Sequence, residues 1–137
     1  MKMLKETTCY KLMVIRDMIH DYSKKDFQEI GITFGNFITM VMIYENSGVT
    51  QAGLAELNHK DRNVIGQIID KLEKKKYVER VREENDRRAY RLYVTELGES
   101  IIEQYWDIAF NGERDLFDKI TTQEQETFCD ILDKLLG

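Results

Sequence analysis

The chain has 137 residues, 42% of them hydrophobic and 33% charged, with no proline. This is the length of one domain with its own core, and the composition is that of a globular rather than a disordered protein. No apolar run approaches the 18 residues of a membrane span, and the net charge of −5 taken alone argues weakly against nucleic-acid binding.

The N-terminal third predicts two helices. Apolar side chains recur at spacings of three and four over residues 4–29, which indicates one long helix ending at Gly31. A second helix, capped by Thr33, is apolar on most sides as far as Tyr44, so we expect it to be central and buried.

A helix-turn-helix pattern follows. Thr50 caps a short helix ending near Leu57, and Asp61 caps a longer one from residue 62 to about 75. The turn between them, residues 58–60, begins with Asn58, a residue type that tolerates left-handed backbone geometry. The expected inner face of the longer helix consists of Val64, Ile65, Ile68, Ile69 and Leu72.

Residues 77–82 and 89–94 alternate polar and apolar side chains around a polar turn at 84–86, which predicts a β-hairpin. A helix-turn-helix followed by a charged hairpin is a winged helix. The expected fold is therefore mainly α with a small β-hairpin wing: a winged helix-turn-helix over residues 33–94, with helical regions at 1–32 and 95–137.

The C-terminal region predicts a helix capped by Thr95, with an interruption at 111–113, and a last helix opened by a capping box from Thr121 to Glu124. Its apolar side chains exceed what a small winged helix can cover. They would be buried either in a dimer or in the core of a monomer.

Charge is unevenly distributed. Residues 60–94 hold eleven Lys or Arg against seven Asp or Glu, a net charge of +4, whereas the rest holds nine against eighteen, a net charge of −9. A basic segment in an acidic chain is the electrostatic footprint expected of a nucleic-acid-binding surface.

Several short motifs, in this order and spacing, resemble the MarR family of bacterial transcriptional regulators. They are Gly31-Ile32-Thr33, Val49-Thr50-Gln51, Leu54-Ala55-Glu56, residues 64–75, Val78-Glu79-Arg80, Asp86-Arg87-Arg88-Ala89 and Thr95-Glu96-Leu97-Gly98. The resemblance implies a single MarR-type domain over 1–137, a homodimer formed through the terminal helices, and a cytoplasmic regulator, more often a repressor, that binds a near-palindromic duplex.

In that arrangement the helix from Arg62 lies in the major groove. Lys60, Arg62, Asn63 and Gln67 are the expected readers, because Arg pairs with guanine and Asn or Gln with adenine; the alternative is a solvated helix face. Thr50, Gln51 and Arg80 are candidate phosphate contacts. The resemblance suggests that the hairpin arginines bind DNA, with Arg88 in the minor groove and Arg87 near phosphate.

Two residues depart from the family pattern. Lys76 replaces a glycine, which costs about 1 kcal/mol if the left-handed geometry persists there. Gly66 lies inside the reading helix where relatives often have threonine, which costs roughly 0.5–1 kcal/mol of helix stability. The operator sequence therefore cannot be copied from relatives.

The resemblance also suggests two switches. Met13, Ile38, Met42 and Tyr44 are candidates to line a crevice for a small amphipathic or phenolic effector, although such side chains commonly fill a core. Cys9 matches the reactive cysteine of the peroxide-sensing branch, but Ser23 and Phe34 stand where that branch has tyrosines, so we expect an inert, buried thiol.

No glycine-rich phosphate loop, catalytic constellation or metal-ligand spacing is visible, so we expect no enzyme activity, cofactor or metal. The alternative to a DNA-binding regulator is a winged-helix module that binds another protein. The charge of the face carrying Arg62 and Gln67 discriminates between the two.

Overall fold

The computed structural model describes residues 3–137, except for the side chains of Arg87 and Arg88. The chain forms two compact units. One comprises residues 24–107, and the other combines the N-terminal residues up to 23 with residues 108–137. The long helix α6 begins in the first unit and ends in the second.

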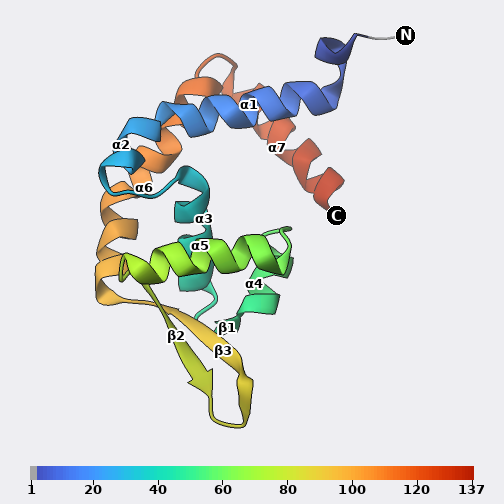
Figure 1. The fold of residues 1–137 in the computed structure, drawn as a ribbon. Helices are drawn as coiled ribbons and strands as arrows, with labels where there is room; N and C mark the ends of the chain where they lie inside the picture. Colours follow the sequence, from blue (N-terminus) through green and yellow to red (C-terminus); the bar gives the residue numbers. More distant parts are fainter. Residues whose placement is uncertain (1–2) are drawn as a thin grey trace. The chain divides into compact units, whose positions relative to one another are not determined.

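The unit of residues 24–107 is a winged helix (Figure 1). Its strands form a three-stranded antiparallel sheet in the order β1-β3-β2. Its elements are α2 (Lys24–Glu29), α3 (Phe34–Glu45), β1 (Val49–Thr50), α4 (Gln51–Leu57), α5 (Arg62–Lys74), β2 (Val78–Glu83), β3 (Asp86–Val94) and the first half of α6 (Glu96–Phe117). The hairpin and the helix-turn-helix are confirmed, whereas the short strand β1 was not predicted.

Local capping sets where these helices begin. Thr33, Thr50 and Asp61 each have extended backbone geometry and accept a hydrogen bond from an amide three residues further on, as N-caps do. All three predicted caps are confirmed. Capping is readable from sequence because donor and acceptor lie within one helical turn of each other.

The core of this unit lies where α3, α5 and the sheet meet. Phe37, Met40 and Ile43 of α3 are fully buried, as are Ile65, Ile69 and Leu72 of α5. The Phe27 ring packs 5.1 Å from the Phe37 ring and 5.6 Å from the Tyr105 ring, measured between centroids. The compact unit therefore includes α2 and the start of α6, beyond the winged helix expected over 33–94.

Two non-glycine residues have left-handed backbone geometry. His59, with φ of 51°, forms the bend of the helix-turn-helix. Asn58 has φ of −91° and instead donates through its amide to the Thr39 hydroxyl, 2.8 Å away. The expectation that Asn58 supplies the left-handed residue is wrong. Lys76 has φ of 65°, so the left-handed geometry persists without the glycine.

The wing is irregular near its tip. Arg82 pairs with Tyr90, but Glu83 pairs with Asp86, so residues 87–89 of β3 have no opposite residue in β2. Such a bulge bends a strand and redirects the residues it contains. Arg87 and Arg88 lie in this bulged stretch of backbone, close to the turn.

The second unit contains η1 (Leu4–Glu6), α1 (Thr8–Tyr22), the end of α6 and α7 (Thr122–Leu136). The prediction of one helix over residues 4–29 is wrong, because α1 ends at Tyr22 and the buried Ser23 separates it from α2. The predicted interruption of α6 at 111–113 is also wrong. Gly112 lets α6 approach α1 closely: a Cβ there would lie 2.9 Å from the Ile19 carbonyl oxygen.

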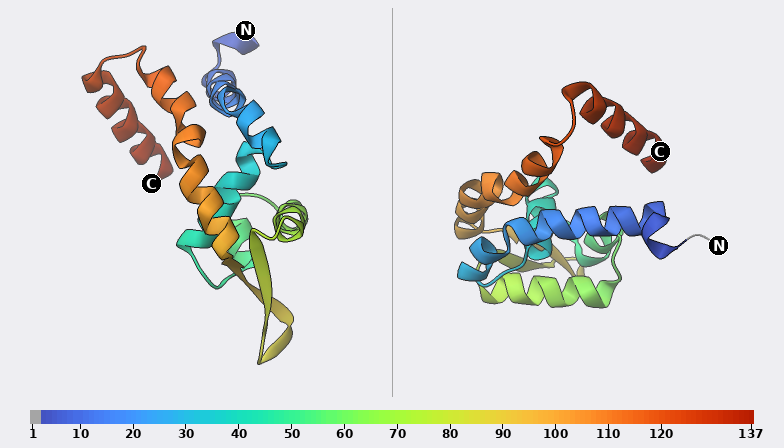
Figure 2. Two further views of the ribbon diagram at one scale, coloured as in Figure 1. Left: turned by 90° about the vertical axis from the view of Figure 1, so that its left-hand side faces the viewer. Right: turned by 90° about the horizontal axis from the view of Figure 1, so that it is seen from above.

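The secondary structure of the second unit is entirely helical (Figure 2). Its helices leave apolar side chains exposed. Neither α1 nor α7 contains a buried residue. Their exposed large apolar side chains are Leu12, Met13, Met18, Tyr22, Ile131, Leu135 and Leu136. Within residues 3–137, no helix is both long and apolar enough to cross a membrane.

Candidate functional site

The exposed face of α5 carries polar side chains suited to hydrogen bonding. Arg62, Asn63 and Gln67 are exposed, and so is Lys60 in the turn before the helix. The opposite face is anchored by the fully buried Ile65, Ile69 and Leu72. The helix thus presents its polar face outward from a rigid core.

Val64 was predicted to lie on the inner face of α5, and this is wrong. Its side chain is 40% exposed, and Ile68 is only half-buried. The reason is that α5 contacts the core along the narrow stripe of Ile65, Ile69 and Leu72. Val64 lies about 100° around the helix from Ile65 and falls outside that stripe.

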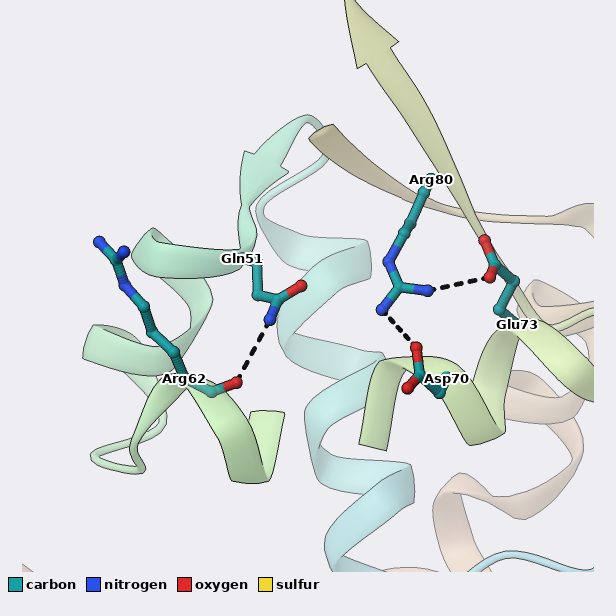
Figure 3. A network of polar contacts seen from close by, with 5 residues as sticks. All are labelled: Gln51, Arg62, Asp70, Glu73 and Arg80. Atoms are coloured by element: carbon teal, nitrogen blue, oxygen red, sulfur yellow. Dashed lines mark hydrogen bonds and ion pairs between the residues drawn. The ribbon is translucent and has the colours of Figure 1, made fainter. Parts of the chain in front are cut away.

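One flank of α5 carries two carboxylates, Asp70 and Glu73, and Arg80 of β2 pairs with both (Figure 3). Its guanidinium nitrogens lie 2.7 Å from Asp70 Oδ1 and 2.9 Å from Glu73 Oε1. The Arg80 side chain is only 19% exposed. Arg80 is thus engaged by two carboxylates of the same chain, and its predicted phosphate contact stays a prediction.

This pairing determines the charge of α5. Two unpaired carboxylates on the helix would repel an anionic partner, but the charge of Arg80 offsets one of their two negative charges. The exposed cations that remain on and beside the helix are Lys60, Arg62, Lys71, Lys74, Lys75 and Lys76. The exposed polar face is therefore positive within a chain whose net charge is −5.

Gln51 and Thr50 also make hydrogen bonds within the protein, and their predicted phosphate contacts stay predictions. The Gln51 side-chain amide donates to the Arg62 carbonyl oxygen at 3.2 Å, as Figure 3 shows. The Thr50 hydroxyl accepts from the Gly53 amide at 3.1 Å and caps α4. The sequence indicated Thr50 as a cap, but the bond of Gln51 spans eleven residues and left no local signal.

The wing has a polar brace that sequence reasoning did not identify. Arg91 of β3 pairs with Glu83 of β2 and donates to the Gly48 carbonyl oxygen at 2.9 Å. Arg82 donates to the Tyr90 hydroxyl at 2.8 Å. The side chains of the predicted DNA-binding residues Arg87 and Arg88 lie outside the described part of the structure.

The three effector-site candidates on α3 do not share one face of that helix. Met13 belongs to the other compact unit. Ile38 and Met42 are half-buried one turn apart on α3, but Tyr44 projects about 200° around the helix from Met42. An effector crevice remains a prediction.

Cys9 is exposed on α1, so the expectation that its thiol is buried is wrong. Ser23, which stands where the peroxide-sensing branch has a tyrosine, is fully buried. Among the described residues, no three His, Cys, Asp or Glu side chains are grouped so as to hold a metal ion.

Comparison with known proteins points to one family. A family model described as MarR family matches residues 30–89. The regulator YybA of Bacillus subtilis, named as an uncharacterised helix-turn-helix-type transcriptional regulator, is 26% identical over 129 residues, covering 89% of this chain and 81% of YybA.

Solved structures agree with this. A MarR transcriptional regulator from Methanosarcina mazei has a TM-score of 0.84 at 25% identity, covering 92% of this chain and 91% of that one. MepR of Staphylococcus aureus, solved in complex with DNA, has a TM-score of 0.84 and covers 95% of this chain and 96% of its own. At 21% identity, the likeness to MepR is one of fold.

Proposed function

We propose that this chain, which is similar to proteins of the MarR family, is a transcriptional regulator that binds a specific DNA duplex through α5. The observation that carries the proposal is the exposed face of α5, where Arg62, Asn63 and Gln67 project from a rigidly packed helix. Their donors and acceptors match the edges of guanine and adenine in the major groove.

The electrostatics of the helix support this function. Arg80 offsets one of the two negative charges of Asp70 and Glu73, so the face that meets DNA carries excess positive charge. Lys60, Lys71 and Lys74 are then available to the phosphates on either side of the groove. A positive, exposed face favours DNA over the alternative of a protein-binding winged helix.

The proposed regulator acts as a homodimer in the cytoplasm. The unburied apolar faces of α1 and α7 support dimerisation, because such faces on a folded chain mark a contact with another molecule. Two copies present two α5 helices, so we expect a near-palindromic site with half-sites about 34–36 Å apart.

Repression by occupying promoter DNA is the proposed mode of action, with release by a small amphipathic or phenolic effector. The support for an effector is limited to Ile38 and Met42, which are half-buried one turn apart on α3. Release is tested by titrating phenolic compounds into a preformed DNA complex.

The main test is fluorescence anisotropy with duplexes selected by the wild-type protein from a random pool. We expect a steep loss of affinity as salt rises, because phosphate contacts release counterions. Arg62→Ala and Asn63→Ala should each weaken binding to the selected site by about tenfold or more. Lys119→Ala is the matched control, since it removes a charge from outside the α5 face.

The function is overturned if no duplex is enriched, or if Arg62→Ala binds as tightly as Lys119→Ala. A protein-binding winged helix would give that result. An affinity independent of salt would count equally against specific DNA binding.

A further inference from the structure

We propose that Gln51 is a positioning residue for base reading: it holds the first turn of α5, and the absence of a side chain at Gly66 is what allows it to do so. The inference rests on the DNA-binding function proposed above. It assigns to Gln51 and Gly66 a joint role in sequence selectivity, although neither is assigned a contact with a base.

The contact joins the two helices of the helix-turn-helix. Gln51 is the first residue of α4, and its amide nitrogen donates to the Arg62 carbonyl oxygen at 3.2 Å. A carbonyl oxygen has two lone pairs, so it accepts this bond as well as the helical bond from the amide four residues on. Gln51 therefore ties the start of α4 to the start of α5 without disturbing the helix.

Gly66 provides the space for this tie. A Cβ added to Gly66 would lie 2.9 Å from the Gln51 amide nitrogen, which is closer than real Cβ contacts. The Gln51 amide is the end of a flexible side chain, so it would move aside rather than unfold the helix. Any larger residue at position 66 should therefore break the bond to Arg62 at small cost in stability.

The first turn of α5, which Gln51 holds in place, carries the side chains that are proposed to contact bases. Arg62 extends away from Gln51, as Figure 3 shows, and Asn63 follows it on the exposed face. Paired hydrogen bonds to a base edge require placement to within about 0.5 Å. Attraction to phosphates tolerates larger displacements, since it falls off slowly with distance. Loss of the tie should therefore reduce selectivity and leave non-specific binding unchanged.

The experiment compares wild type, Gln51→Met, Gly66→Ala and the double variant on a selected duplex and on a scrambled duplex of equal length. Methionine preserves the length of glutamine but cannot donate a hydrogen bond. Gly35→Ala in α3 is the matched glycine control, because its nearest contact would be an ordinary 3.7 Å. Backbone amide exchange in α5 is measured in parallel, without DNA.

We expect both single variants to lower the ratio of selected to scrambled affinity by about threefold to tenfold, the effect of one hydrogen bond. The double variant should be no worse than either single one, and Gly35→Ala should match wild type. Amides of the first turn of α5 should exchange faster in Gln51→Met, in Gly66→Ala and in the double variant, but not in Gly35→Ala.

Equal weakening on both duplexes would make Gln51 a phosphate ligand and overturn the proposal, as would additive effects in the double variant. If the wild type selects no duplex, the proposed function fails instead. The exchange measurement then decides separately whether Gln51 holds the turn, and unchanged exchange would overturn that role.

Discussion

The guanidinium of Arg80 lies 2.7 Å from the carboxylate of Asp70, and this ion pair joins strand β2 to the outer flank of α5. Glu73, one turn along the same helix, completes the arrangement at 2.9 Å. The wing thereby contributes to the electrostatics of α5.

Arg80→Met should weaken binding to the selected duplex by about tenfold, because it exposes two carboxylates to the phosphates. The same substitution in an Asp70→Asn, Glu73→Gln background should have little effect. Anisotropy titrations of the four proteins at one salt concentration measure this. An equal loss in both backgrounds would show that Arg80 itself contacts DNA.

Ile131→Asp should convert a dimer into a monomer, because Ile131 is 48% exposed on an α7 face that a single chain leaves uncovered. Size-exclusion chromatography with light scattering measures the mass. Asp133→Asn, about 200° around α7 from Ile131, is the control and should remain dimeric. A monomeric wild type would contradict the dimer outright.

Lys76→Gly should stabilise the protein by about 1 kcal/mol, because glycine adopts a φ of 65° without the steric cost of a Cβ. Lys75→Gly is the control: its φ is −76°, so glycine there should destabilise by roughly 0.5–1 kcal/mol. Urea unfolding at equal protein concentrations gives both values. If Lys76→Gly proved destabilising, the lysine side chain would have to make contacts that outweigh its backbone strain.

Gly98→Ala should destabilise the protein by about 1–3 kcal/mol. A Cβ there would lie 2.1 Å from the Tyr77 carbonyl oxygen, to which the Thr95 amide donates at 3.0 Å. The start of α6 would have to move away from the sheet. Thermal unfolding compared with Gly35→Ala, whose added methyl group meets no close atom, measures the cost of this approach; equal stability of the two would refute it.

Glu124 should make the stability of α7 depend on pH. The Thr121 backbone amide, and secondarily its hydroxyl, hydrogen-bond the carboxylate and hold the pKa of Glu124 below its ordinary value of 4.5. The capping contribution is therefore complete above pH 4.5 and is lost as the pH falls through the folded-state pKa.

Urea unfolding between pH 3 and pH 7 measures this effect. The difference between wild type and Glu124→Ala should shrink towards low pH, whereas Glu126→Ala, in the same turn but outside the capping box, should show no such trend. A constant difference would mean that the carboxylate charge plays no part in the cap.

Periodicity and capping are local properties, and for that reason the sequence predicts the helix-turn-helix, the hairpin and the caps at Thr33, Thr50 and Asp61. Each depends on residues within a few positions of one another. The same locality explains the errors at Ser23 and Val64, where packing against distant elements ends a helix or leaves an apolar side chain exposed.

The partners of Gln51 and Arg80 depended on the fold alone. An arginine or glutamine on a charged surface has the same sequence pattern whether it meets water, phosphate or a carboxylate. Folding places Gln51 beside Arg62 and Arg80 beside Asp70, pairs separated by eleven and ten residues. The choice of partner follows from how α4 and β2 pack against α5, and no local spacing encodes that packing.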